Sequence, residues 1–300
     1  FKTSLSASPS VRLEPFSMRL IQRHPELIAA LVFASCCLLL QAWRSQVLLA
    51  TYEQGIFQQV LWNTLHGQLF ESTLSSQLST NVIHAGELPS VDYERLGQHF
   101  TPTLLIWAPL LGLIGAAALP IVQVGLVTSA GLLLHRLAAK LVPKRTANWI
   151  TYAYFCGNAL IGPTLGNFTD LCQLPLAVFA LMLGLIERRS WLTLVAAGLL
   201  PLIREDTGVV LVAIGLWLLL RHRRQWLLAV MLMGWGGGWV VLTTNVLMPL
   251  FSDDNAKRFM VENFGQYLEG EASQGSSSLT MVQRALDCLL YTSDAADDEE

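Results

Sequence analysis

Ionisable side chains that could take part in chemistry are few in this sequence, and they lie between long apolar stretches. They are Glu53, His99, Asp170 and the triplet Arg204-Glu205-Asp206. A carboxylate that reaches a hydroxyl can remove its proton, and an imidazole can shuttle a proton or donate to a phosphate. Ionisable residues between membrane-spanning segments are costly, which suggests a purpose for the triplet. These residues are our candidates for chemistry.

Each of these residues also has a purely structural interpretation. Glu53 could be a solvated carboxylate at a helix N-terminus, where negative charge is stabilised. A lone histidine such as His99 is usually structural, and Asp170 could cap the helix that follows it. Arg204 could pair with a neighbouring acid in a polar turn. The spacing of the residues leaves both interpretations open.

The composition predicts a membrane protein. Hydrophobic residues make up 53% of the 300 positions and charged residues 14%, with a mean hydropathy of +0.47. A soluble domain has about 25% charged residues, so a water-soluble fold is not expected. The sequence contains no basic stripe or nucleic-acid-reading motif, and no phosphate loop, dinucleotide fingerprint or zinc signature.

Seven apolar segments approach the length of about 20 residues that a membrane-spanning helix needs. They are 27–43, 120–134, 149–165, 172–186, 191–203, 208–220 and 226–251. We therefore predict an all-α integral membrane protein, built as a polytopic helical bundle. Its transmembrane domain is predicted to cover 27–251 and to include a large outer loop at 44–100.

Four clusters of basic residues predict which loops lie in the cytoplasm, because short cytoplasmic loops are rich in Lys and Arg. The clusters are Arg19/Arg23, Arg136/Lys140/Lys144/Arg145, Arg188/Arg189 and Arg221/Arg223/Arg224. With all four inside, the N-terminal segment 1–26 is cytoplasmic, and the loops with Glu53, Asp170 and Glu205 share the outer face. Residues 101–134 must then cross an odd number of times, yet they contain two apolar pieces. We therefore expect 101–115 to be a re-entrant or interfacial helix.

The two ends of the sequence differ from the rest. The chain begins at Phe1, and Met18, followed by basic residues and an apolar run, would make a suitable start. Residues 252–288 are expected to begin a truncated extracytoplasmic segment. Residues 289–300 lose all apolar periodicity, so we interpret them as a non-native tail.

Six stretches resemble one known family, in order and with matching spacing. They are YEQGIFQQVLWN (52–63), RLGQHFTP (95–102), IGPTLGNFTDLCQLPL (161–176), REDTGVVL (204–211), TTNVLMPLFS (243–252) and RFMVENFGQYLEG (258–270). The sequence thus resembles a bacterial, cyanobacterial-type family of predicted membrane proteins, domain of unknown function 2079. That family looks related to the GT-C glycosyltransferases, membrane enzymes that take a sugar from a polyprenyl-phosphate carrier on the outer face.

The resemblance implies a GT-C-like glycosyltransferase in a bacterial inner membrane, with membrane lipid and a lipid-linked sugar donor as partners. In that fold a carboxylate of the first outer loop commonly serves as the base or organises the acceptor. The resemblance implies such a role for Glu53, which is our candidate for the base, and Glu205 is our second catalytic candidate. The substrate-binding candidates are Tyr52, Gln59, Asn63, His99, Arg204 and Asp206. Asp170 is the metal candidate, since carboxylate ligands suit Mg²⁺ or Mn²⁺.

Two departures from the family pattern keep other functions open. Glu53 stands where the pattern has aspartate, and Thr169 stands where it has histidine. If that histidine is essential, a non-catalytic membrane scaffold is the alternative. A polytopic membrane transporter is another alternative, in which carboxylates would bind a coupling ion near the midplane. The acids cluster in outer loops and no inverted repeat is evident, which speaks against transport.

Overall fold

The computed structural model describes residues 24–47, 49, 51–75, 93–166 and 168–251. Most of the predicted segment 1–26, including Met18, therefore lies outside the described residues. The same is true of residues 76–92 in the predicted outer loop, and of the predicted segments 252–288 and 289–300.

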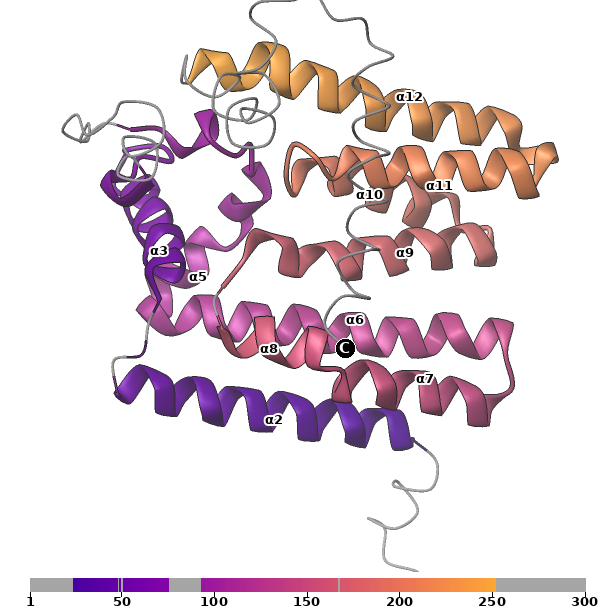
Figure 1. Cartoon of the computed structure of the whole chain (residues 1–300), viewed down its shortest axis with the longest axis horizontal. Helices are drawn as coiled ribbons and strands as arrows, with labels where there is room; N and C mark the ends of the chain where they lie inside the picture. The colour runs from indigo at the N-terminus through magenta and orange to yellow at the C-terminus, as the bar shows by residue number, and fades with distance from the viewer. Residues whose placement is uncertain (1–23, 48, 50, 76–92, 167, 252–300) are drawn as a thin grey trace, which may run out of the picture.

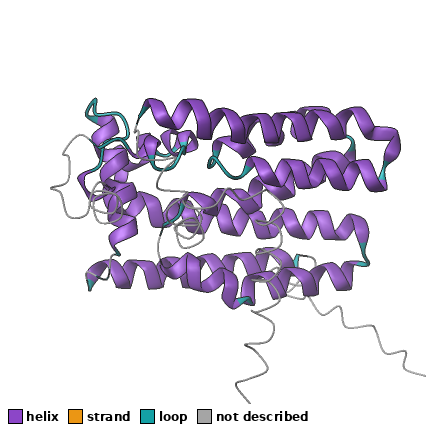
Figure 2. Cartoon of the chain, turned by 45° about the horizontal axis from the view of Figure 1, so that its top comes forward, coloured by secondary structure: helices purple, strands orange, loops and turns teal. Residues whose placement is uncertain are grey.

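The described residues form a bundle of helices that run side by side (Figures 1 and 2). The α-helices are α2 Pro25–Gln46, α3 Tyr52–Leu65, α5 Ala108–Ile114, α6 Ala118–Leu141, α7 Lys144–Cys156, α8 Asn158–Gly166, α9 Leu174–Glu187, α10 Ser190–Leu199, α11 Gly208–Arg221 and α12 Trp226–Leu242. Among these residues the only β-pairing is an isolated antiparallel bridge between Glu71 and Glu94. The predicted all-α fold is confirmed.

Four helical stretches are long and apolar enough to cross a membrane. They are Pro25–Gln46, Ala108–Leu141, Asp170–Glu187 and Arg223–Leu250. The protein is therefore a polytopic helical membrane protein. Two further apolar helices, Ser190–Leu202 and Gly208–Arg221, are each about 20 Å long at 1.5 Å per residue, which is less than a hydrocarbon core of about 30 Å.

The helix α6 lies between α2 and α9 and packs against α2, α7 and α9 (Figure 1). One apolar core joins α2, α3, α5 and α6, and a second joins α9, α10, α11 and α12. The side chain of Glu187 strengthens the contact between α6 and α9, because it is paired with Arg136 at 3.0 Å and with Lys140 at 3.4 Å.

The region 101–134 contains one helix that can cross the membrane by itself. The helix α5 has seven residues and is about 10 Å long. Gly115 follows it with a φ of 65°, which residues other than glycine rarely adopt. After this break α6 runs for 24 residues, about 36 Å. The preceding piece consists of a 3₁₀ turn, η2 Pro102–Ile106, and α5, which packs against α3. This arrangement agrees with the single crossing that the parity argument requires.

The predicted span 149–165 is not one continuous helix, which corrects the sequence-based boundaries. Gly157 has an extended backbone and separates α7 from α8. Side chains of other helices hold the end of α8: Gln41 donates to Thr164 O at 2.8 Å, and Gln123 donates to Pro163 O at 2.9 Å. These bonds satisfy carbonyl groups that a helix end leaves without an intrahelical partner.

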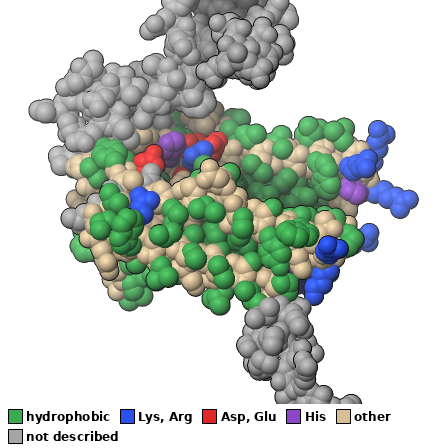
Figure 3. All heavy atoms as spheres, turned by 60° about the horizontal axis from the view of Figure 1, so that its bottom comes forward, with side chains coloured by type: hydrophobic (Ala, Val, Ile, Leu, Met, Phe, Trp, Pro, Cys, Tyr) green, Lys and Arg blue, Asp and Glu red, His purple; other side chains and the backbone are tan. Residues whose placement is uncertain are grey.

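The charged side chains of the described residues divide between the two ends of the bundle (Figure 3). We call one end the basic end. It has nine Lys and Arg residues and two acids: Arg136, Lys140, Lys144, Arg145, Arg188, Arg189, Arg221, Arg223, Arg224, Glu26 and Glu187. The other, acidic end has six acids and three arginines: Glu53, Glu71, Glu94, Asp170, Glu205, Asp206, Arg44, Arg95 and Arg204.

Three of the exposed tryptophans lie near the basic loops. Trp191 and Trp226 are in the first turns of α10 and α12, and Trp149 is in the second turn of α7. Tryptophan is enriched where a bilayer meets water, so these three exposed side chains are typical of a membrane interface at the basic end.

Candidate functional site

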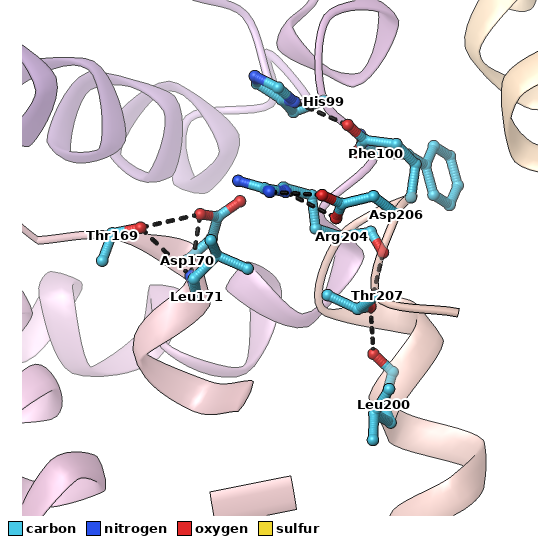
Figure 4. Close-up of polar contacts among 10 residues, drawn as sticks. His99, Phe100, Thr169, Asp170, Leu171, Leu200, Arg204, Asp206 and Thr207 are labelled. Carbon is cyan, nitrogen blue, oxygen red and sulfur yellow. Dashed lines mark hydrogen bonds and ion pairs between the residues drawn. The ribbon is translucent and has the colours of Figure 1, made fainter. Parts of the chain in front are cut away.

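Three segments that are far apart in the sequence meet at the acidic end. They are the stretch around His99 before η2, the turn Thr169–Leu171 before α9, and the turn Arg204–Thr207 before α11 (Figure 4). Of the candidates from the sequence, the structure therefore brings together His99, Asp170 and the triplet that begins at Arg204. These residues form what we call the acidic-end cluster.

Glu205 orients His99. Oε1 of Glu205 lies 2.8 Å from Nδ1 of His99, and its Oε2 accepts a hydrogen bond of 3.0 Å from the backbone N–H of Phe100. Since an ionised carboxylate only accepts hydrogen bonds, Nδ1 has the hydrogen and Nε2 of a neutral ring is left as an acceptor. The Glu205 side chain is 14% exposed and that of His99 is 38% exposed. The pair thus has a half-buried carboxylate and a more accessible imidazole.

Arg204 forms a bidentate ion pair with Asp206. Nε donates to Oδ1 at 2.8 Å and the outer guanidinium nitrogen donates to Oδ2 at 2.5 Å. Burial by itself would raise the pKa of Asp206, but the hydrogen bonds and charge of Arg204 outweigh it and lower the pKa below its ordinary value. Hydrogen bonding to Asp206 likewise raises the pKa of Arg204, and the charges of Asp170 and Glu205 add to this effect. Arg204 is firmly cationic.

Asp170 is the most buried acid of the cluster, with 3% of its surface exposed. Its Oδ1 accepts hydrogen bonds from Leu171 N at 2.9 Å and from Thr169 Oγ1 at 3.2 Å. Its Oδ2 is buried and has no hydrogen-bond partner among the described residues, and Figure 4 shows the carboxylate facing the guanidinium of Arg204. Thr169 caps the 3₁₀ turn Asp170–Gln173, so this residue has a structural task.

The surroundings of Asp170 do not fit a divalent metal. Such a site needs several oxygen or nitrogen ligands. Within the described part of the chain, no group of three or more His, Cys, Asp and Glu side chains could hold a metal ion. The positive charge that Asp170 faces is Arg204. The arrangement offers neither Mg²⁺ nor Mn²⁺ a ligand set.

Gln173 connects the turn of Asp170 to the segment after His99. Its Oε1 accepts from Trp107 Nε1 at 3.0 Å, and its Nε2 donates to Thr103 Oγ1 at 3.1 Å and to Asp170 O at 3.2 Å. The sequence analysis did not select this residue. A polar residue one turn after Asp170, within an apolar stretch, could have indicated it.

Thr207 holds the turn that contains the triplet. Its buried Oγ1 lies 2.7 Å from both Leu200 O and Arg204 O (Figure 4). The hydroxyl thereby ties the end of the α10 segment to the start of α11. Sequence reasoning missed this residue too, because a threonine next to a helix start is common.

The other candidates lie on α3, within the segment that the sequence analysis placed in the outer loop. Glu53 is in the first turn with an exposed side chain. Hydrogen bonds join the three substrate-binding candidates to the loop at 70–75: Tyr52 to Leu74 O, Gln59 to Thr73 and Ser72, and Asn63 to Glu71 O. These contacts fold the loop against α3, and a role in substrate binding stays a prediction.

Aromatic packing connects α3 to the cluster. The ring of Phe57 on α3 meets the ring of Phe168 edge to face, with centroids 5.2 Å apart. Phe168 is buried and lies two residues before Asp170. The helix α3 therefore packs against the segment that leads into the turn with Asp170.

Comparison with protein families gives a match over most of the chain. Residues 44–293 match the family described as "Predicted membrane protein (DUF2079)". The chain belongs to this family. All candidate site residues of this DUF2079 member lie inside the matched part, and the resemblance noted from the six sequence stretches is confirmed. No curated protein and no solved structure matches the chain.

Proposed function

We propose that this DUF2079 member is a GT-C-like membrane glycosyltransferase, with a polyprenyl-phosphate-linked sugar as donor. The observation that supports this most directly is the acidic-end cluster. It combines an oriented histidine, the His99–Glu205 pair, with the fixed cation Arg204 at one end of a membrane bundle. A base and a cation at a membrane surface suit the transfer of a group from a lipid phosphate to a hydroxyl.

The proposed orientation places the N-terminus in the cytoplasm and the acidic end outside, in a bacterial inner membrane. The charge distribution supports it, because nine of the twelve Lys and Arg residues in the described segments lie at the basic end. The donor's phosphate would then lie at the outer headgroup level, beside Arg204.

The chemical step would be a displacement at the anomeric carbon of the sugar. The acceptor hydroxyl gives its proton to the base, its oxygen bonds to the anomeric carbon, and the bond from that carbon to the phosphate oxygen breaks. The leaving polyprenyl phosphate keeps the electron pair as an anion, which Arg204 stabilises by charge-assisted hydrogen bonds. Arg204 retains its positive charge throughout, since its pKa is raised.

Two residues compete for the role of base. With Nδ1 facing Glu205, Nε2 of a neutral His99 ring is the nitrogen that can accept a proton, and Glu205 would then act as its positioning residue. Glu53 is the assignment that the family resemblance implies, and its exposed position on α3 suits contact with an acceptor from solution. Tyr52, Gln59 and Asn63 would bind the acceptor from the same helix.

The test is transfer of radiolabelled sugar from polyprenyl phosphate by membranes that contain the protein. Loss of the true base is expected to lower the rate by about 10²–10⁴-fold, so His99→Gln and Glu53→Gln identify it. Glu71→Gln is the matched control, since it removes an acid at the same end and leaves the backbone bond from Asn63 to Glu71 O intact.

Three outcomes would count against the proposal. Absence of transfer by the wild-type protein with every donor sugar would reject the enzyme. Uptake of the label without transfer would favour a transporter. Equal transfer by wild-type, His99→Gln and Glu53→Gln proteins would show that the activity does not depend on this site.

A further inference from the structure

The bidentate pair between Arg204 and Asp206 has the geometry of a bound oxyanion. A guanidinium fork binds a carboxylate and a phosphate in the same way, through two parallel N–H···O bonds. Asp206 fills this fork from a position only two residues away, and its side chain is 53% exposed. An exposed carboxylate next to its partner can leave without disturbing the buried part of the cluster.

Asp170 explains how Arg204 could remain in place after such a departure. Its buried Oδ2 has no hydrogen-bond partner among the residues that the structure describes, and the carboxylate faces the guanidinium (Figure 4). The turn that presents Asp170 is held independently of Asp206, through Leu171 N, Thr169 and Gln173. Arg204 thus has one exposed and one buried acid as neighbours.

The net charge of the cluster opposes a second anion while Asp206 is present. Asp170, Glu205 and Asp206 are three acids, and Arg204 is the one permanently charged cation among the cluster residues. An approaching phosphate would meet both the repulsion of these acids and a guanidinium fork that is already occupied. Departure of Asp206 from the fork frees the guanidinium for a phosphate, and substitution of Asp206 by a neutral residue also lowers the repulsion.

We propose that Asp206 is an internal competitor for the oxyanion site of Arg204, and that a phosphate group binds by displacing it. This inference rests on the proposed function, because it assigns the phosphate of the lipid-linked donor as the displacing ligand. It also changes the role of Asp206, which the sequence analysis assigned to substrate binding. In this arrangement Asp206 keeps the site closed to anions until a phosphate takes its place.

The experiment measures equilibrium binding of inorganic phosphate and of farnesyl phosphate to the purified full chain in detergent, with farnesol as the uncharged control. In Asp206→Asn both phosphates are expected to bind about tenfold tighter, since a competing charge-assisted pair is lost. In Arg204→Gln the binding of both phosphates is expected to be lost. Arg223→Gln removes an exposed cation at the basic end and is expected to bind like the wild type.

The two phosphates distinguish the sources of the ligand. Tighter binding of farnesyl phosphate than of inorganic phosphate, with farnesol unchanged by the substitutions, assigns a lipid phosphate. Equal affinities would assign free phosphate and overturn the lipid assignment. Asp206→Ser serves as a second variant if Asp206→Asn does not fold, because it also removes the charge.

Binding that is unchanged or weaker in both Asp206 variants would overturn the displacement, as would wild-type binding in Arg204→Gln. The outcome is separable from that of the proposed function. The expected binding pattern without any sugar transfer would reject the transferase and keep the displacement. Sugar transfer without the expected binding pattern would keep the transferase and reject the displacement.

Discussion

Among single residues, Glu205 differs most from its sequence-based assignment. It was a catalytic candidate because an acid between apolar segments suggests function. Both of its carboxylate oxygens accept hydrogen bonds, from His99 and from the backbone of Phe100. A carboxylate whose two oxygens are both engaged in hydrogen bonds is better suited to orient an imidazole than to remove a proton itself.

The Arg204–Asp206 pair predicts a pH dependence of stability at the residue scale. The pKa of Asp206 is lowered in the folded protein, so the pair stabilises the fold above the unfolded-state pKa of about 3.9 and this stability is lost as the pH falls through the folded pKa. The pair is partly exposed, so we expect at most about 1 kcal/mol.

Thermal unfolding of the wild-type protein and Asp206→Asn between pH 3 and pH 7 measures this contribution. The wild type is expected to be the more stable protein at about pH 5–7, and the difference should shrink below about pH 4. A difference that stays constant down to pH 3 would mean that the ion pair contributes nothing that depends on the charge of Asp206.

At the scale of the elements, glycines decide how closely α11 and α12 pack. A Cβ atom on Gly236 would lie 2.3 Å from Gly208 O and 2.8 Å from Leu211 Cβ. The neighbouring Gly234 and Gly238 face open space, where a Cβ would meet nothing within 4 Å. Gly236 therefore makes the tight contact of this run, whereas a Cβ on Gly237 would meet Val212 Cγ2 at an ordinary 3.7 Å, and sequence spacing alone does not show this difference.

We expect Gly236→Ala to destabilise the protein by about 1–3 kcal/mol, because the new methyl group meets backbone atoms that can move only if the helices separate. Gly238→Ala is the matched control. It adds the same methyl group to the same helix without a contact and improves helix propensity. Denaturation in detergent compares the two variants, and equal stabilities would contradict the close helix contact.

At the scale of the whole molecule, the described residues separate their charges between two ends, and this separation predicts the orientation. In intact cells we expect an impermeant maleimide to label Gln68→Cys and Ala116→Cys, in a background without the native cysteines. Arg223→Cys should react only after permeabilisation, because it lies at the basic end. Gln68 follows α3, and Ala116 lies in the turn between α5 and α6.

Ala116→Cys is the informative variant of this set. If it reacts like Arg223→Cys, then the segment before α6 crosses the membrane and the re-entrant interpretation of 101–115 fails. Reversal of all three sites would instead keep the fold and invert the orientation, which would place the acidic-end cluster in the cytoplasm.

Much of the fold was predictable because it depends on the hydrophobicity and the charge of whole segments. Apolar length predicts helices that can cross a membrane, and the basic clusters predict which loops share a side. The same reasoning predicts a single crossing within 101–134, and the break at Gly115 before the 24-residue α6 agrees with it. The division of the predicted span 149–165 at Gly157 did not, because the side chains that hold the end of α8 come from α2 and α6.

The sequence by itself determined the class of protein and the residues that could do chemistry, since composition and spacing are local properties. Only the tertiary structure decided which of these residues pair. His99 and Glu205 are 106 positions apart, and Gln173 reaches Thr103 across 70 positions. Such contacts depend on how the helices pack. A hydrogen bond forms only when donor and acceptor are about 3 Å apart, and no pattern along the chain places two distant side chains that accurately.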